Sequence, residues 1–470
     1  MALAATAQAH LTEMPQKDTY RLIVFDSAGT AILLEPHGRE YRLPTIEIPK
    51  FSRPAHEATC LLRNSWGMCS VFLFAGVLEE IPNASYFAVL ESKDGFRSCP
   101  RGMEWFTIHH VLSNLLLGQE RRVVQSSYRK AVRQIPADSK QPFCRVGWLA
   151  DLEDWVRKTL DPSGVQLKGF EQLNGCETFS LIRFATTQRP VWFKAVGEPN
   201  LHEYGISLAL ARLLPDFVPA ILATKPEWHG WLMADAGESA LNETEDSSAW
   251  QAAVTALADL QIDSLAKTDD LLKAGCRDSR IATLLDLVDP FLDTLADLMN
   301  QQTKVPPAIL SRQELTGLGA TLKDALSCLS ALPIPDALGH SDFNPGNIIV
   351  GPKGSVFIDW AEAHVSHPFL TCEYLISHLR KDFPSLVRFE GAIKSSYSKR
   401  WHAISSPEHV SEAFLFSPLV AVFAYAAAGN VWRDTERLKV PQVPGYLRSL
   451  TRRMKQEADL IQRRRVECPN

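Results

Sequence analysis

The sequence predicts an α+β protein: a small antiparallel-sheet lobe followed by a helical lobe, with an additional α/β domain at the N-terminus. Its 470 residues are too many for one ordinary core. Residues 165–234 contain five strand-like segments with a helix after the third, and mainly helical patterns follow. We expect domains at residues 1–140, 141–236 and 237–470, with Pro136–Pro142 marking the first boundary.

The composition is that of a globular protein with a slightly acidic charge. Apolar residues make up 46% and charged residues 22% of the chain, and the formal net charge is -5. This balance argues against a general nucleic-acid-binding surface. Nine cysteines without a CxxC pair favour reduced cytosolic thiols over a disulfide framework or a zinc site. We therefore expect a cytoplasmic protein without a nucleic-acid partner, and its oligomeric state stays open.

Two stretches of the chain bear on membranes, and neither predicts membrane insertion. The segment from Met1 to His10 lacks a basic start and a sustained apolar core, so we predict no signal peptide. The longest apolar run, residues 414–428, is shorter than a membrane span and contains Pro418. We expect a buried helix there and no membrane partner.

The N-terminal region alternates strand-like and helical patterns. The expected strands are residues 20–25, 30–34, 69–74 and 85–90, and the expected helices are residues 54–66 and 108–117. Gly67 is a typical end for the first helix. This order of elements resembles a degenerate Nudix-type domain. The stretch His56–Arg63 carries one glutamate where Nudix hydrolases have an acid-rich metal-binding helix, which is a poor magnesium site.

The small lobe carries a lysine on its third strand and a glutamate on the following helix. The expected strands are residues 165–172, 179–185, 191–196, 218–222 and 230–234, and the expected helix is residues 200–214. Lys194 lies on the third strand, where an edge-strand lysine that prevents aggregation is one interpretation. Glu203 lies in the first helical turn, where Asn200-x-x-Glu203 has the pattern of a capping box.

The rest of the chain is predicted to be mainly helical. The expected helices are residues 148–160, 250–260, 280–298, 369–380, 386–394, 411–428 and 446–465. Residues 241–300 hold twelve acidic and four basic residues. These acids either attract a cationic substrate or form the solvent faces of amphipathic helices.

One hairpin interrupts the helices and brings oxygen-bearing side chains together. Residues 347–350 and 355–358 are short apolar strands joined by Gly351–Gly354. Because a hairpin returns its ends to one place, Asn347 and Asp359 can face the same small volume. An amide oxygen and a carboxylate suit a hard cation such as Mg²⁺, and Asp342 is free to handle a proton. The alternatives are a hydrogen-bonding pair at the strand ends and a turn-capping Asp342.

These residues, in this order, resemble a known enzyme family. His340-x-Asp342-x-x-x-x-Asn347, followed by Ile358-Asp359, is similar to the catalytic and metal-binding segments of the aminoglycoside phosphotransferase and choline kinase family. These enzymes are relatives of the protein kinases. The resemblance covers roughly residues 145–450, and Lys194 and Glu203 precede the motif in kinase order. It implies a two-lobed, protein kinase-like fold.

The resemblance implies roles for the hairpin residues in ATP-dependent phosphoryl transfer. Asp342 is the expected catalytic base for a substrate hydroxyl. His340 is expected to brace the catalytic loop by hydrogen bonding, which is close to the role of an ordinary core histidine. Asn347 and Asp359 are expected to hold the Mg²⁺ that bridges the nucleotide phosphates.

The resemblance also implies a nucleotide site in the small lobe. Lys194 is expected to reach the α- and β-phosphates, anchored by Glu203. Met233 and Ala234 match the hinge whose backbone meets the adenine edge. An ordinary buried strand is the other interpretation of these two residues.

The segment after Asp359 bears on the phosphate acceptor. Only residues 360–368 separate it from the next predicted helix, which leaves no room for the activation loop of a protein kinase. We therefore expect a small hydroxyl substrate, such as an aminoglycoside, an amino alcohol or a sugar-like molecule. The alternatives are a non-catalytic kinase-fold binding or regulatory module and a hydrolase activity in the Nudix-like domain.

Overall fold

The computed structural model describes residues 16–78, 86–95, 99–116, 118–133, 142–237, 239–351, 354–440 and 442–467. The chain divides into two compact units. Unit 1 comprises Met1–Tyr204 and Ala220–Asp235, and unit 2 comprises Gly205–Pro219 and Ala236–Asn470. The expected boundary segment Pro136–Pro142 lies, except for Pro142, outside the described residues, so the domain limits stay predictions.

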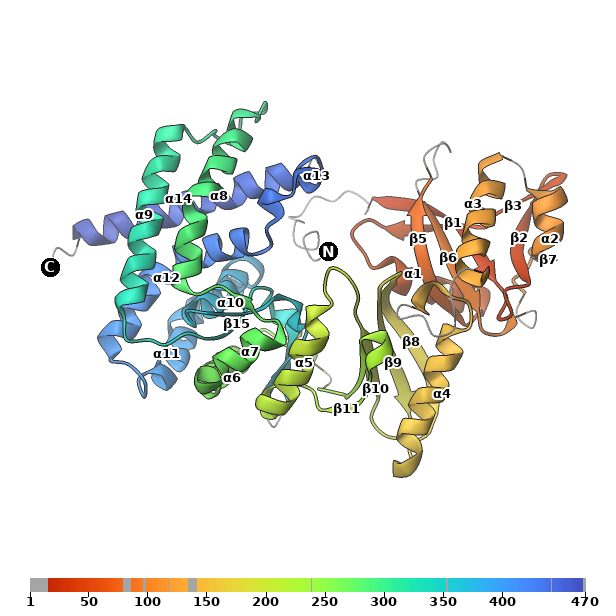
Figure 1. The fold of residues 1–470 in the computed structure, drawn as a ribbon, viewed down its shortest axis with the longest axis horizontal. Helices are drawn as coiled ribbons and strands as arrows, with labels where there is room; N and C mark the ends of the chain where they lie inside the picture. Colours follow the sequence, from red (N-terminus) through yellow and green to blue (C-terminus); the bar gives the residue numbers. More distant parts are fainter. Residues whose placement is uncertain are drawn as a thin grey trace. The chain divides into compact units, whose positions relative to one another are not determined.

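Unit 1 begins with a seven-stranded mixed sheet in the order β3-β2-β1-β6-β5, with β4 paired to β1 and β7 paired to β2 (Figure 1). The β1–β6 pairing is parallel, and the others recorded are antiparallel. The strands are β1 (Lys17–Phe25), β2 (Ala31–His37), β3 (Glu40–Arg42), β4 (Thr45–Pro49), β5 (Ser70–Val77), β6 (Tyr86–Ser92) and β7 (Glu104–Thr107). The predicted strands are confirmed. We did not predict β3, β4 and β7, which are three to five residues long and too short to show a clear period.

The first helix of unit 1 has the predicted bounds. Helix α1 (Pro54–Trp66) ends at Gly67, whose φ of 63° lies in the left-handed region that favours glycine. The Gly67 N–H donates to the Arg63 carbonyl at 3.1 Å. The predicted helix 108–117 is only partly α-helical, because α2 (Ile108–His110) continues as a π-helical turn at Val111–Leu115. Helix α3 (Gly118–Tyr128) follows.

The second sheet of unit 1 is the predicted five-stranded lobe. Its antiparallel strands have the order β11-β12-β10-β9-β8, so β10 is the central strand. The strands are β8 (Leu167–Cys176), β9 (Phe179–Thr186), β10 (Val191–Ala195), β11 (Ile221–Lys225) and β12 (Gly230–Ala234). Helix α4 (Trp148–Leu160) precedes the sheet, and α5 (His202–Leu213) follows its third strand.

The two sheets of unit 1 share one hydrophobic core. Phe25 and Val71 of the first sheet belong to the same buried cluster as Trp148 of α4 and Phe184 and Phe193 of the second sheet. A polar contact joins the sheets as well, because the Gln172 side chain on β8 bonds to the Phe72 backbone N–H and carbonyl at 2.7 and 3.1 Å. These shared contacts hold β8 against β5.

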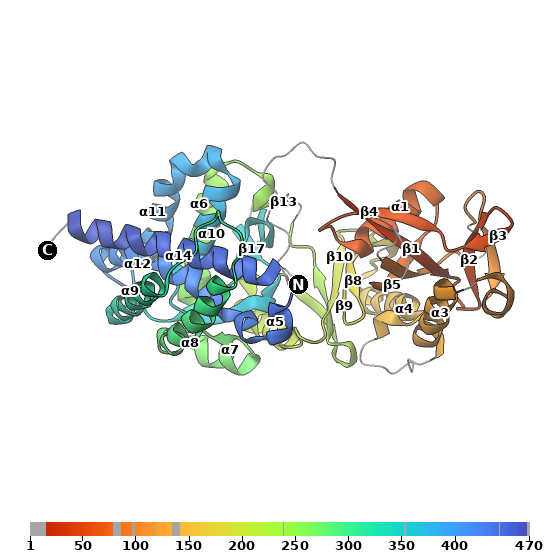
Figure 2. The same cartoon turned by 90° about the horizontal axis from the view of Figure 1, so that it is seen from above.

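Unit 2 is mainly helical, as predicted (Figure 2). Its helices are α6 (Ser247–Ser264), α7 (Thr268–Ala274), α8 (Ile281–Asn300), α9 (Arg312–Ala331), α10 (Phe369–Asp382), α11 (Glu390–Trp401), α12 (Pro407–Ala428), α13 (Thr435–Leu438) and α14 (Gln442–Glu467). Among the described residues, two three-stranded sheets accompany them, with the orders β13-β16-β17 and β14-β18-β15. Their strands are β13 (Ser239–Ala240), β14 (Arg277–Asp278), β15 (Ala337–His340), β16 (Ile348–Gly351), β17 (Gly354–Phe357) and β18 (Ala363–Ser366). The α+β class and the helical second part are therefore confirmed.

Helix α9 is the longest element that the sequence analysis missed. Its start carries a capping box, in which the Glu314 N–H donates to Ser311 Oγ at 3.2 Å and Ser311 N–H donates to Glu314 Oε2 at 2.8 Å. Gly317 and Gly319 obscure the helical pattern. Gly319 is buried, and a Cβ at this position would lie 2.9 Å from Leu292 of α8, so glycine permits close packing of the two helices.

Helix α12 contains the predicted apolar run. Within the described residues it is the one helix that passes a length and composition test for a membrane span. About half of its apolar window, 56%, is buried inside the protein, and Phe416, Val420 and Phe423 belong to the core of unit 2. The buried helix is confirmed.

Candidate functional site

Lys194 and Glu203 form a buried ion pair in unit 1. The Lys194 ammonium donates to Glu203 Oε1, and the two residues are 7% and 2% exposed. Because β10 is the central strand of its sheet, the interpretation of Lys194 as an edge-strand lysine is wrong. The Glu203 backbone N–H donates to the Asn200 carbonyl at 3.0 Å, which begins α5 and brings the carboxylate toward the strand.

Met233 and Ala234 lie at the end of β12. Met233 stands opposite Trp192 of β10, and Ala234 stands opposite Val191. The Ala234 N–H donates to the Ala220 carbonyl at 2.9 Å, so this group is already bonded within unit 1. The adenine-hinge role of both residues stays a prediction.

The predicted hairpin is present in unit 2. Strands β16 (Ile348–Gly351) and β17 (Gly354–Phe357) pair antiparallel, with Ile348 opposite Phe357. The Ile358 N–H donates to the Asn347 carbonyl at 3.0 Å. This bond closes the open end of the hairpin and places Asp359 one residue beyond the partner of Asn347, as the sequence predicts.

His340 links the catalytic loop to the end of the hairpin. Its Nδ1 accepts the Asp342 N–H at 3.0 Å, and its Nε2 lies 3.3 Å from the Ile358 carbonyl. These two bonds require the neutral ring with its proton on Nε2. Burial lowers the pKa of His340, which favours the same form. The contacts are those of the bracing histidine that we expect.

Asp342 is held by donors on several sides. Asn344 Nδ2 donates to its Oδ1 at 3.1 Å, and Asn347 Nδ2 donates to its backbone carbonyl at 2.8 Å. Burial raises the pKa of Asp342, and the Asn344 hydrogen bond opposes this rise. The negative charges of Asp359 and Glu362 raise the pKa further. Asp342 is therefore a more basic carboxylate than an exposed aspartate.

Asn347 and Asp359 present the oxygen groups expected for a divalent cation. The Asn347 amide uses its nitrogen to brace the loop at Asp342, which directs its carbonyl oxygen elsewhere. Asp359 is exposed and has φ 66° and ψ 59°, a left-handed conformation that is uncommon outside glycine and tolerated by aspartate. An amide oxygen beside a carboxylate fits Mg²⁺, which prefers oxygen ligands.

A tyrosine cluster beside Asp342 escaped the sequence analysis. It consists of Tyr374 on α10, Tyr425 on α12 and Tyr446 on α14. The Tyr374 hydroxyl lies 3.4 Å from Asp342 Oδ1, and the centroids of the Tyr374 and Tyr425 rings are 5.2 Å apart. The Tyr446 hydroxyl donates to the Tyr425 hydroxyl at 3.1 Å. Three tyrosines on separate helices leave no sequence spacing from which the cluster could be predicted.

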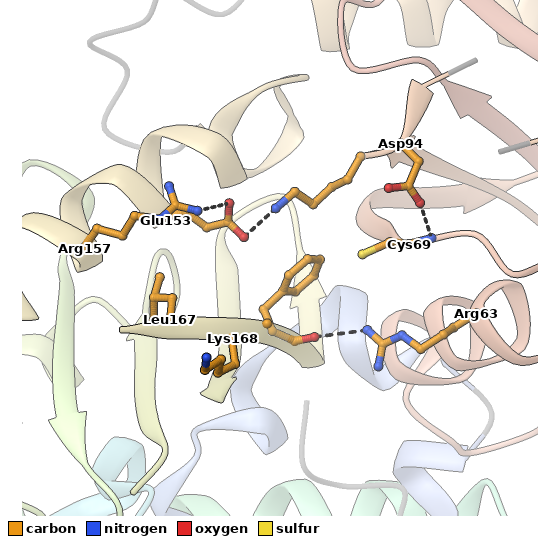
Figure 3. A pocket seen from close by; sticks show the side chains of 10 residues that line it. Arg63, Cys69, Asp94, Glu153, Arg157, Leu167 and Lys168 are labelled. Atoms are coloured by element: carbon orange, nitrogen blue, oxygen red, sulfur yellow. Dashed lines mark hydrogen bonds and ion pairs between the residues drawn. The ribbon is translucent and has the colours of Figure 1, made fainter. Parts of the chain in front are cut away.

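A cavity of about 530 Å³ lies elsewhere in unit 1 (Figure 3). Its charged lining comprises Arg63, Lys93, Asp94, Glu153, Arg157 and Lys168. Glu153 bridges Lys93 and Arg157, and Arg63 donates to the Phe170 carbonyl at 3.1 Å. None of the predicted site residues lines this cavity, which is therefore separate from both predicted groups.

Comparisons with known proteins bear on the family. Residues 200–378 match the model of the phosphotransferase enzyme family. No curated protein matches the chain. The Nudix-like resemblance of residues 1–140 is not confirmed.

Several solved structures are similar in fold. A choline kinase from Streptococcus pneumoniae is 14% identical, with 65% of this chain and 99% of that chain covered and a TM-score of 0.42. A choline kinase from Cryptosporidium parvum is 11% identical, with 68% and 96% covered and a TM-score of 0.45. A macrolide 2′-phosphotransferase from Brachybacterium faecium is 14% identical, with 63% and 97% covered and a TM-score of 0.39.

The matched residues include Glu203 and the whole hairpin motif with Asp342, Asn347 and Asp359. The predicted family resemblance is therefore confirmed over this stretch.

Proposed function

We propose that the protein is an ATP- and Mg²⁺-dependent kinase that transfers the γ-phosphate to a hydroxyl of a small molecule. The observation that carries this proposal is the hydrogen-bonded hairpin, in which His340 and Asn347 hold the loop of Asp342 from two sides. Phosphoryl transfer depends mainly on positioning and charge neutralisation, and this loop is built for positioning.

Asp342 is the proposed base. The substrate hydroxyl gives its proton to Asp342, its oxygen bonds to the γ-phosphorus, and the bond to the bridging oxygen of ADP breaks. The raised pKa of Asp342 favours this role, because a more basic carboxylate accepts a proton more readily. Asn347 and Asp359 are the residues that would hold Mg²⁺, which when bound would neutralise charge on the phosphates.

Lys194 and Glu203 are the proposed phosphate-binding pair. A buried ion pair is a weak source of stability, because desolvation of both charges offsets their attraction. Its presence on a central strand is better explained by the need to hold an ammonium group at a set position for the nucleotide. The hinge at Met233 and Ala234 is the proposed adenine contact.

The chemistry near Asp342 supports a small hydroxylated acceptor. Tyr374 and Tyr425 offer aromatic rings, and Tyr446 adds a hydroxyl to the cluster. Asp342 supplies negative charge, and Glu362, which pairs with Arg277 at 3.0 Å, is a second carboxylate whose charge acts on it. Aromatic faces and carboxylates together favour a cationic molecule, so amino alcohols and aminoglycosides are the first candidates, with sugar-like molecules next.

The test is a screen for ATP consumption with amino alcohols, aminoglycosides, sugars and nucleosides as acceptors. We expect one class to give Mg²⁺-dependent ADP release, and Asp342→Asn to lower kcat by about 10²–10⁴-fold. Asp286→Asn, a change at an exposed residue of α8, is the matched control and keeps full activity. Equal activity of Asp342→Asn and wild type would show that the base is assigned wrongly.

A further inference from the structure

Three side chains in unit 1 form a mixed nitrogen, sulfur and oxygen cluster outside both predicted groups. His56 and Cys60 lie on α1, and Glu171 lies on β8. Their potential ligand atoms all lie within 4.8 Å of one another, and all three residues are partly buried. Cys60 Sγ lies 3.7 Å from the His56 ring nitrogens, and His56 Nδ1 lies 3.9 Å from Glu171 Oε1.

The local structure explains why these groups meet. His56 and Cys60 are four residues apart, so they project from the same face of α1. Arg63, three residues further on, shares this face and donates to the Phe170 carbonyl of β8 at 3.1 Å (Figure 3). Gln172 holds the other side of Glu171 through its two bonds to Phe72. The cluster is therefore framed by fixed contacts on both elements.

We propose that His56, Cys60 and Glu171 bind a zinc-class transition-metal ion, with water as the fourth ligand. Thiolate, imidazole and carboxylate are the three side chains that Zn²⁺ takes in proteins. Bond lengths of about 2.0–2.3 Å place tetrahedral ligand atoms roughly 3.2–3.8 Å apart. The separations of 3.7 and 3.9 Å approach this range, and all three ligand atoms lie within 4.8 Å of one another, so side-chain rotations that draw them together complete the site.

The competing contacts of these side chains are weak. Arg183 stands opposite Glu171 in the β8–β9 register, but no ion pair between them is recorded in the described part of the chain. A thiol–imidazole contact at 3.7 Å is a weak hydrogen bond. A bound ion would replace both contacts with stronger ones and would join α1 to β8. This site is independent of the proposed kinase chemistry.

The test uses cobalt as a spectroscopic substitute for zinc. The full-length protein is stripped with a chelator and titrated with Co²⁺ at neutral pH. We expect one equivalent to bind with a sulfur-to-cobalt charge-transfer band, and Zn²⁺ to displace it. Cys60→Ser loses the band, whereas Cys176→Ser, at an exposed cysteine of β8, keeps it. His56→Gln lowers Zn²⁺ affinity by at least the ~10–100-fold that loss of an outer-shell partner costs.

Circular dichroism shows whether each variant is folded, and His56→Gln provides a second test if Cys60→Ser does not fold. Zn²⁺ raises the Tm of the wild type, because the ion binds the folded state, and leaves the Tm of a folded ligand variant unchanged. Absence of the charge-transfer band in the wild type overturns the proposal. A band that survives in folded Cys60→Ser also overturns it, because another thiol must then bind the cobalt.

Discussion

The Lys194–Glu203 pair and the hairpin around Asp342 differ in how their charged side chains are balanced. In the first, one buried cation and one buried anion neutralise each other. In the second, Asp342, Asp359 and Glu362 gather around a neutral His340, and their mutual repulsion helps to raise the pKa of Asp342. The first region pairs opposite charges, whereas the second gathers three carboxylates, of which Glu362 also pairs with Arg277 at 3.0 Å. This difference supports the proposal that a cation binds at the hairpin and that Lys194 is held in place for the nucleotide.

The largest effect should come from breaking the balanced pair. Lys194→Met leaves the Glu203 carboxylate buried without its cation, which costs about 3–5 kcal/mol of unfolding free energy. Denaturant unfolding measured by fluorescence and circular dichroism checks this value. The double variant Lys194→Met/Glu203→Gln should recover part of the loss, because no charge then stays buried alone.

The control for this experiment is Lys17→Met, whose amine pairs with Glu47 while both side chains are at least half exposed. Exposed pairs contribute little, so its unfolding midpoint should stay close to wild type. An equal loss of unfolding free energy in Lys17→Met and Lys194→Met would contradict the prediction that the Lys194 variant is less stable because its partner is buried.

A smaller effect should follow from removal of one oxygen group at the hairpin. Asn347→Ala removes the proposed ligand and the donor to Asp342, and should raise the Mg²⁺ concentration for half-maximal turnover at least about tenfold. Asn347→Asp keeps an oxygen but loses the N–H donor. Steady-state kinetics over a range of Mg²⁺ concentrations separates the two roles. Loss of a Mg²⁺ ligand raises the Mg²⁺ concentration for half-maximal turnover, whereas loss of the hydrogen bond to Asp342 changes kcat at saturating Mg²⁺. Identical Mg²⁺ curves for Asn347→Ala and wild type would argue against the ligand role.

The smallest effect concerns pH. The proposed base must be ionised, so activity should fall as the pH drops through the raised pKa of Asp342. Glu362→Gln removes a negative neighbour and should move this acid limb of kcat/KM to lower pH. Because the pKa of Asp342 is raised in the folded protein, its ionised form lowers the free energy of unfolding at neutral pH. This loss of stability is recovered as the pH falls through the raised pKa.

The pH profile is measured for wild type, Glu362→Gln and the exposed control Asp286→Asn. The control should leave the acid limb in place. A limb that moves to higher pH in Glu362→Gln has the wrong sign for a base repelled by Glu362, and would exclude Asp342 as the titrating group.

Local patterns in the sequence predicted much of the fold. Helix α1 has the predicted bounds because Pro54 and Gly67 mark its two ends. The hairpin of β16 and β17 followed from two short apolar runs around a glycine-containing turn. The order of Lys194, Glu203, Asp342, Asn347 and Asp359 predicted a family resemblance over roughly residues 145–450, and the family model matches residues 200–378, which include all of these except Lys194. In each case the signal lies within a few residues or in a fixed order along the chain.

Tertiary structure determined the side-chain partners that local patterns in the sequence did not predict. Only strand order shows that Lys194 is central and faces Glu203, because the same strand pattern also suits an edge. The tyrosine cluster and the His56–Cys60–Glu171 cluster join elements that are distant along the chain. The scattered cysteines argued against a zinc site, because helical spacing places Cys60 beside His56 but only packing of α1 on β8 brings Glu171 to them. Periodicity reports local conformation, whereas the partners across a core depend on how whole elements pack.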